Sequence, residues 1–191
     1  MKRLYIIAGP NGAGKTTASY TVLPEILNCN EFVNADEIAR GISPFNPETV
    51  SIQAGKLMLH RINELLQKKE TFAFETTLAS KIFIEFIERA QKQEYETVLL
   101  FLMLNSVELA YERVETRVKE GGHNIPKEII KRRFYSGLKN FFTNYITIVD
   151  KWFLVDNSGE EFQFIAEGTK DELIIKNNKV WTALKKEYYG N

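Results

Sequence analysis

The chain has 191 residues, 44% of them hydrophobic, and its 25 Lys and Arg are balanced by 25 Asp and Glu. This length predicts one domain with a sizeable core, and the charge balance gives no global field that favours nucleic acid or an anionic membrane. A lone cysteine, Cys29, excludes an intrachain disulfide and a cysteine-rich metal site, so we expect a buried thiol. With no apolar run of membrane-spanning length and no signal-peptide pattern, the expected location is the cytoplasm.

A glycine-rich loop follows the first predicted strand, residues 3–8. It has the spacing G-x-x-x-x-G-K-T of the phosphate-binding loop in nucleoside-triphosphate enzymes, and its residues are Gly9, Pro10, Asn11, Gly12, Ala13, Gly14, Lys15, Thr16 and Thr17. Glycines can turn backbone N–H groups toward a phosphate, Lys15 supplies an ammonium, and the Thr16 hydroxyl suits a phosphate-bound Mg²⁺. The plainer interpretation is a glycine-rich turn before an ordinary helix. The strand–loop–helix setting favours the phosphate site, with ATP and Mg²⁺ as cofactors.

Short apolar strands then alternate with helices along the chain. We predict helices at about 15–23, 48–69, 80–93, 106–120 and 126–150, and further strands at 31–34, 71–74, 97–104 and 152–155. Such alternation is typical of a parallel sheet with helices on both faces. The fold class is therefore α/β, a three-layer P-loop fold with a five-stranded parallel sheet. We expect a single domain over 1–191, with a core at about 1–158 and a β-hairpin and helix at about 160–191.

Polar residues follow the strands at the edge where an open parallel sheet binds its ligands. Asp36, after the second strand, could accept a proton from a substrate hydroxyl; it could also cap the following helix, and both roles can hold. Glu75, Thr76 and Thr77 follow the third strand as candidate substrate contacts. For Glu75, a water-mediated Mg²⁺ contact, substrate binding, capping and an ion pair all remain open. Asn105 stands where a Walker-B aspartate would follow the fourth strand, which favours small kinases over motor-type ATPases.

Four arginines flank a glycine–proline break, residues 121–126, that would form the hinge of a small lid. Arg113 and Arg117 lie four positions apart and so share one helix face, while Arg132 and Arg133 open the next helix. Guanidinium groups at such a lid could clamp the transferring phosphoryl group. The alternative for each of them is a solvated helix face paired with nearby glutamates. We expect at least one of the four to serve phosphoryl transfer.

Two further positions belong to the predicted site. Asn157 follows the fifth strand and is expected to contact the nucleotide, near its base. His123 lies in the glycine–proline break, where it could contact a substrate or hydrogen-bond the lid backbone. Because no second histidine is near it in sequence, a zinc site is not expected.

Four segments of the chain, taken together and in this order, resemble the zeta-toxin-like P-loop kinases. They are the loop from Gly9 to Thr17, Val33-Asn34-Ala35-Asp36, Phe74-Glu75-Thr76-Thr77, and the stretch from Arg113 to Pro126 that contains Gly-Gly-His-Asn-Ile-Pro. The resemblance covers about residues 2–158. It implies a fold like that of nucleotide and shikimate kinases, with the parallel strand order 2-3-1-4-5, and it implies ATP and Mg²⁺.

The resemblance also implies a reaction, phosphorylation of a hydroxyl of UDP-N-acetylglucosamine, and an antitoxin protein as a candidate partner. It maps the base to Asp36 and the sugar-nucleotide contact to Glu75, with Lys15 and a helix arginine, Arg113, at the phosphates. The second lid arginine has three candidates, Arg117, Arg132 and Arg133. The alternative functions are a kinase of another metabolite, nucleotide or nucleic-acid end, and a nucleotide-dependent toxin–antitoxin or regulatory module with little turnover. We see no membrane signal and no strong nucleic-acid signal.

Overall fold

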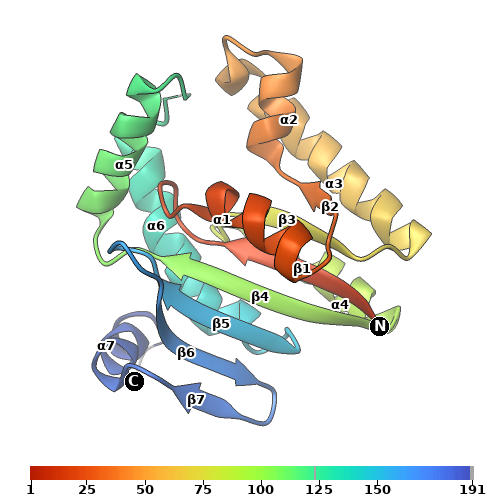
Figure 1. Cartoon of the computed structure of the whole chain (residues 1–191), viewed down its shortest axis with the longest axis vertical. Coiled ribbons are helices and arrows are strands. Elements are labelled where there is room, and N and C mark those ends of the chain that lie inside the picture. The colour runs from red at the N-terminus through yellow and green to blue at the C-terminus, as the bar shows by residue number, and fades with distance from the viewer. Residues whose placement is uncertain (123, 190–191) are drawn as a thin grey trace.

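One mixed sheet of seven strands runs through residues 1–122 and 124–189, the part of the chain that this computed structural model describes (Figure 1). The strand order is β2-β3-β1-β4-β5-β6-β7. The first five strands are parallel, and their bounds are β1 (Lys2–Ala8), β2 (Glu31–Val33), β3 (Phe72–Thr76), β4 (Tyr95–Met103) and β5 (Lys151–Asp156). The predicted α/β class and the order 2-3-1-4-5 are therefore confirmed for these strands.

The predicted count of five strands is wrong, because the C-terminal hairpin extends the same sheet. Its strands, β6 (Gln163–Thr169) and β7 (Leu173–Ile175), continue the sheet beyond β5 as antiparallel members. A short connection after β5 lets the chain turn straight back, and such a connection allows only antiparallel pairing. β6 also buries Ile165 and Ala166 completely, so its place in the sheet is supported by the core.

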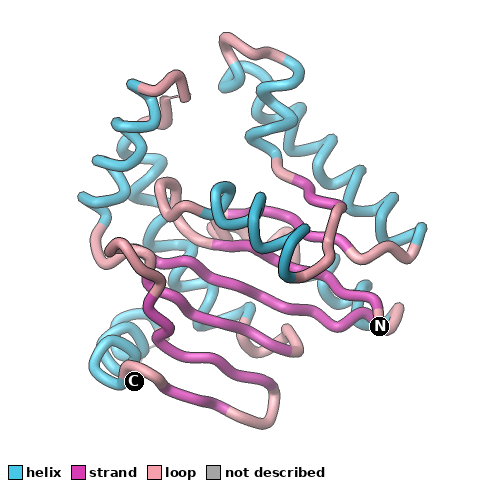
Figure 2. Tube along the Cα trace, viewed as in Figure 1, coloured by secondary structure: helices cyan, strands magenta, loops and turns pink. Residues whose placement is uncertain are grey.

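Helices cover both faces of the sheet, as predicted (Figure 2). Their bounds are α1 (Lys15–Thr21), α2 (Ala35–Ile42), α3 (Ser51–Lys68), α4 (Ile84–Lys92), α5 (Val107–Lys119), α6 (Lys127–Asn140) and α7 (Asn178–Tyr188). Three short helical turns complete them, namely η1 (Val22–Ile26), η2 (Pro47–Val50) and η3 (Phe141–Tyr145). In Figure 1, α1 lies in front of the central strands, while α4 and α6 lie behind them.

The predicted helix over 126–150 is shorter than expected. Its α-helical part, α6, ends at Asn140, and η3 follows as a π-helical turn. Leu138, Phe141 and Tyr145 are all buried and keep helical spacing through both segments. The apolar pattern alone therefore does not show where the α-helix ends.

The core lies on both sides of the central strands. Leu4 and Ile6 of β1 pack into the larger cluster, and Tyr5 and Ile7 pack into a smaller one that includes Cys29. Cys29 is a buried thiol as expected, and burial raises its pKa to about 11. Within the described ranges, no helix is long and apolar enough to cross a bilayer. This core fixes the carboxyl ends of β1, β2 and β3 beside one another, where the site lies.

Candidate active site

The loop between β1 and α1 needs glycine for two physical reasons. Gly9, Gly12 and Gly14 have φ angles of 142°, 81° and 77°, which L side chains rarely adopt. A Cβ atom on Gly14 would also lie 2.7 Å from Nδ2 of Asn157. That Asn157 amide donates to the carbonyl of Ala13 at 2.8 Å and so ties the phosphate loop to the segment after β5. The glycines and the Asn157 amide together fix the backbone conformation of this loop.

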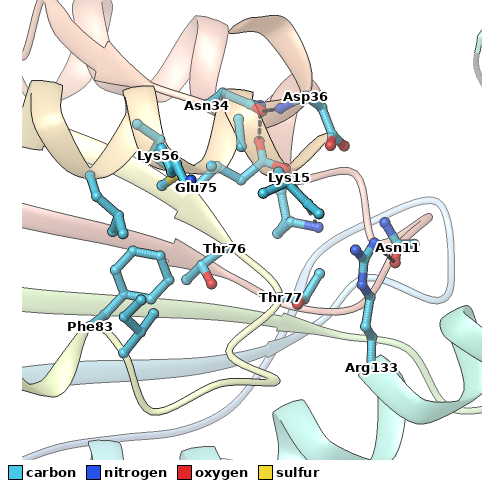
Figure 3. A pocket seen from close by; sticks show the side chains of 16 residues that line it. Asn11, Lys15, Asn34, Asp36, Lys56, Glu75, Thr76, Thr77, Phe83 and Arg133 are labelled. Carbon is cyan, nitrogen blue, oxygen red and sulfur yellow. Dashed lines mark hydrogen bonds and ion pairs between the residues drawn. The ribbon is translucent and has the colours of Figure 1, made fainter. Parts of the chain in front are cut away.

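A nearly buried network joins the loop to the ends of β2 and β3 (Figure 3). The Lys15 ammonium donates to the Pro10 carbonyl at 2.9 Å and lies 3.6 Å from Oε1 of Glu75. Oε2 of Glu75 accepts from the Thr16 hydroxyl at 2.7 Å and from the Asn34 amide at 2.9 Å. The side chains of Lys15 and Glu75 are only 6% and 10% exposed. An ammonium, a hydroxyl and a carboxylate are thus gathered where the loop would hold a polyphosphate.

Asn34 caps α2, so the alternative in which Asp36 caps this helix is wrong. The Asn34 side-chain oxygen accepts from the backbone N–H groups of Asp36 and Glu37 at 2.8 and 3.4 Å. Asp36 is therefore in the first turn of α2, and its carboxylate makes no hydrogen bond or ion pair to another described residue. This carboxylate is left available at the mouth of the site.

A cavity of about 390 Å³ opens beside this network, bordered by α2, α3 and α6. One side of it carries charged and polar groups from separate elements, and the other side is apolar. The polar lining comprises Asn11, Lys15, Asn34, Asp36, Lys56, Glu75, Thr76, Thr77 and Arg133, and the apolar lining includes Ile52, Met58, Leu59, Ile82 and Phe83. Such a concave site, apolar with a few convergent polar groups, is typical of small-ligand sites.

The α6 arginine that reaches the cavity is Arg133. Its Nη1 donates to Oδ1 of Asn11, in the phosphate loop, at 3.3 Å. Burial lowers the pKa of Arg133, with the nearby Asp36 carboxylate acting in the opposite direction. The guanidinium stays protonated regardless, because its ordinary pKa is far above neutral. Arg132, which we predicted as a catalytic residue, is exposed and does not line the cavity.

Arg113 is held by the segment that follows β5. Its guanidinium donates to the carbonyls of Asn157 and Ser158 at 2.7 and 3.0 Å. Since Asn157 also binds the phosphate loop, Arg113 braces the loop rather than projecting into the cavity. Arg117, one helical turn further, has Nε and Nη2 buried without a hydrogen-bond partner in the part of the chain that the structure describes. His123 lies outside the described residues.

Thr76 and Thr77 form the floor where β3 ends. The Thr76 hydroxyl accepts from the backbone N–H of Leu78 at 3.0 Å and so shapes the turn, while both residues line the cavity. Gly137 of α6 packs directly against the Thr77 carbonyl, a contact that a larger residue would prevent. Thr17, at the first turn of α1, is exposed and stays outside this cavity.

Sequence reasoning assigned no role to two residues of the site, Asn34 and Lys56, and left Arg133 among several candidate arginines. Asn34 bonds to both Glu75 and α2, Lys56 lines the cavity, and Arg133 reaches it in place of Arg132. A usable signal existed for Arg133, because it lies three positions after the buried Ile130 and four before Gly137, on the inner side of α6. No comparable indication for Lys56 exists in the sequence, since its position at the cavity depends on how α3 packs across the sheet.

The family model for Zeta toxin matches residues 1–169. This chain belongs to the Zeta toxin family. The resemblance predicted from the motifs is thereby confirmed. A relative from Haemophilus influenzae, an uncharacterized protein, is 29% identical over 131 residues, which cover 66% of this chain and 88% of the relative.

Solved structures similar to this chain share its fold at low sequence identity. A structure of AvrRxo1-ORF1:AvrRxo1-ORF2 with sulphate ions has a TM-score of 0.75 at 14% identity, covering 96% of this chain and 63% of that one. This chain therefore spans less than two thirds of that protein's length. A structure from the PezAT toxin–antitoxin system of Streptococcus pneumoniae has a TM-score of 0.68 at 15% identity, covering 100% and 80%. Shikimate kinase from Acinetobacter baumannii, in complex with shikimate, has a TM-score of 0.50 at 19% identity, covering 97% and 92%.

Proposed function

We propose that this protein transfers the γ-phosphoryl group of ATP to a hydroxyl of a small acceptor, with UDP-N-acetylglucosamine as the first acceptor to test. The observation that carries the proposal is the Asp36 carboxylate, which lines the same cavity as the phosphate-loop Lys15. Membership of the Zeta toxin family supports a kinase. So do the likeness to shikimate kinase and to an AvrRxo1-ORF1:-ORF2 structure with ATP.

In this proposal Asp36 is the general base. It takes the proton of the acceptor hydroxyl as that oxygen attacks the γ-phosphorus, and the bond from phosphorus to the β–γ bridging oxygen breaks to release ADP. Lys15 and Arg133 stabilise the charge on the phosphoryl oxygens during transfer, because both are cations at the cavity wall. Arg117 is a further candidate, since two of its buried nitrogens have no described partner.

The residues around Thr16 fit Mg²⁺, a hard cation that prefers oxygen ligands. The Thr16 hydroxyl and the Glu75 carboxylate lie 2.7 Å apart and would hold the ion together with water and phosphate oxygens. Bound Mg²⁺ would neutralise charge on the outer phosphates. Glu75 also lines the cavity, so contact with the acceptor is compatible with the same position.

Two variants and one product assay test this function. The purified chain is incubated with ATP, Mg²⁺ and a panel of sugar nucleotides, nucleosides, small metabolites and oligonucleotides, and products are identified by mass spectrometry. We expect a phosphorylated sugar nucleotide, and a loss of at least about 100-fold in turnover for Asp36→Asn with ATP affinity retained. Glu37→Gln is the matched control, because Glu37 pairs outside the site with Arg40 at 3.2 Å.

The same assay separates the alternatives. A product from another metabolite, a nucleotide or an oligonucleotide end would replace the proposed acceptor and keep the kinase. ATP binding without any phosphorylated product would favour a regulatory binding module. If Asp36→Asn kept full turnover while Lys15→Ala abolished it, the base assignment would be wrong.

We also propose an antitoxin protein as a binding partner. The support is the family itself and the likeness to a structure from the PezAT toxin–antitoxin system. Expression of the chain alone should slow bacterial growth, and Lys15→Ala should remove that effect. Growth that is unaffected by the active chain would argue against both toxicity and the need for an antitoxin.

A further inference from the structure

The outer edge of β7 is an open sheet edge with apolar side chains. β7 is the last strand of the sheet, so no strand of the described chain pairs with its outer side (Figure 1). Leu173, Ile174 and Ile175 are 47%, 37% and 39% exposed. β7 has three residues and contains neither proline nor a bulge, and the charged residues Glu172 and Lys176 flank it. Its outer backbone groups are therefore open to pairing with another strand.

The backbone groups that face outward can be identified from the hairpin bonds. Thr169 donates to the Glu172 carbonyl at 2.8 Å, and Lys176 donates to the Ile165 carbonyl at 2.9 Å. Residues 172 and 176 thus point their backbone groups toward β6. Because these directions alternate along an antiparallel strand, Leu173 and Ile175 point theirs away from β6, into the open edge.

We propose that β7 pairs with β7 of a second copy of this chain, antiparallel and centred on Ile174. In this register Leu173 lies opposite Ile175 of the second copy, and the reverse pair is identical by symmetry. These are the residues with outward backbone groups, so the pairing forms four backbone hydrogen bonds. Ile174 packs against its own counterpart. The two-fold axis closes the assembly as a dimer instead of a fibre.

The charges that flank β7 match this register. Glu172 lies opposite Lys176 of the second copy, and Lys176 lies opposite Glu172 of the second copy. Both are pairs without backbone hydrogen bonds between them, in which side chains approach most closely. Lys176 is only loosely engaged within its own chain, 3.8 Å from Glu167. The segment from Glu172 to Lys176 is thus self-complementary in charge, which favours a second copy over an unrelated strand.

This assembly does not depend on the proposed kinase activity. β7 lies at the edge of the sheet farthest from β2, and none of its residues lines the active-site cavity. It also lies beyond residues 1–169, the part matched by the Zeta toxin family model. Dimerisation is therefore a property of this chain's C-terminal segment, and it is measured without nucleotide.

Charge reversal tests both the dimer and its register. Sedimentation equilibrium of the full chain, over about 1 to 500 μM, should show a monomer–dimer equilibrium with a dissociation constant in the micromolar range, as a small interface implies. Glu172→Lys should raise that constant about tenfold, because two attractive pairs become repulsive. Adding Lys176→Glu to this variant should restore the wild-type value. Glu160→Lys, the same charge change on an exposed residue outside β7, is the control.

Backbone blocking gives a second, independent variant. Ile175→Pro removes an outward N–H and leaves the β6–β7 ladder intact, so it should make the chain monomeric with an unchanged circular dichroism spectrum. A chain that stays monomeric across the whole concentration range overturns the proposal and leaves this edge for a different partner. A dimer whose dissociation constant is unchanged by Glu172→Lys and by Ile175→Pro overturns it too, because its interface lies elsewhere.

Discussion

Thr16 and Glu75, 59 positions apart in the chain, share a hydrogen bond of 2.7 Å from the threonine hydroxyl to Oε2 of the glutamate. The carboxylate therefore stands beside the hydroxyl that follows the phosphate-loop lysine. Asn34 donates to the same oxygen at 2.9 Å and fixes its position from β2. Groups from α1, from the N-cap of α2 and from β3 thus meet at one oxygen atom, Oε2 of Glu75, in the proposed Mg²⁺ and phosphate site.

Neutralising Glu75 should weaken the response to Mg²⁺. Glu75→Gln keeps the side-chain shape and an acceptor for Thr16 but removes the negative charge, so we expect the Mg²⁺ concentration for half-maximal activity to rise about tenfold. A Mg²⁺ titration of the phosphorylation rate measures this. Glu70→Gln, outside the cavity, is the control. An unchanged Mg²⁺ requirement would assign Glu75 to the acceptor alone.

Arg133 and Arg132 form a natural pair of test positions. Arg133→Ala removes a cation from the cavity wall and should reduce turnover by about 100-fold or more, as loss of a phosphoryl-clamping arginine does. Arg132→Ala changes an exposed neighbour and should leave turnover within about threefold. Steady-state kinetics of both variants shows which of the two arginines contributes to turnover. Equal effects would mean that α6 moves substantially when substrate binds.

The site could be predicted from the sequence where strand ends determine it. Gly9 to Thr17, Asp36 and Glu75 follow buried parallel strands, and such residues must meet at one edge of the sheet. Arg132 and Arg133 are adjacent, so the rotation of α6 about its axis decides which one faces inward. That rotation depends on packing of Ile130 and Phe134 against the core, a tertiary property. The spacing from Ile130 favours Arg133, and the structure shows that Arg133 is the one that lines the cavity.

The place of β6 and β7 in the sheet also could not be predicted from the sequence alone. Residues 162–175 predicted a hairpin, because a Gly-containing turn separates two alternating segments. Nothing in that local pattern says whether a hairpin stands alone or pairs with β5. Gly168 provides the reason in three dimensions, since a Cβ atom there would lie 2.6 Å from the Trp152 ring. The hairpin joins the sheet by fitting closely against a side chain that is sixteen residues earlier in the sequence.

A side chain on Gly14 should damage the phosphate loop. Gly14→Ala forces an L-residue to φ 77° and brings Cβ to 2.7 Å from Asn157, so we expect a stability loss of about 1–3 kcal/mol and no measurable ATP binding. Gly41→Ala is the control, because Gly41 lies in α2 with open space around it. It should stabilise the chain by about 0.5–1 kcal/mol. Thermal unfolding and calorimetric ATP titration measure both effects.

Asp150 should make stability depend on pH in the acid range. Burial raises its pKa, but hydrogen bonds from the backbone and hydroxyl of Thr97, from Lys170 and from Gln91 outweigh burial, and the net pKa lies below the ordinary value. A lowered pKa in the folded state adds stability above about pH 4, the unfolded value, and that stability is lost as pH falls through the folded pKa. Asp150 is therefore expected to stabilise the chain at neutral pH.

Asp150→Asn tests this dependence. At pH 7 it should lower the free energy of unfolding by about 1 kcal/mol, a modest loss because the carboxylate is partly solvated. The two unfolding curves should converge as pH falls below about 4, where the wild-type carboxylate also becomes neutral. Urea unfolding from pH 7 to pH 3 provides the measurement. A difference that stays constant over this range would assign the loss to geometry instead of charge.

The contact of Gly137 with the Thr77 carbonyl couples two walls of the cavity. α6 lies directly on the segment that follows β3, and the Asn140 amide adds a 2.8 Å hydrogen bond to the Leu78 carbonyl of that segment. Arg133 sits one turn earlier on the same helix. Any displacement of α6 therefore moves the Arg133 guanidinium and the Thr77 wall of the cavity together. The shape of the acceptor pocket is thus coupled to the position of the cation proposed to bind the phosphoryl group.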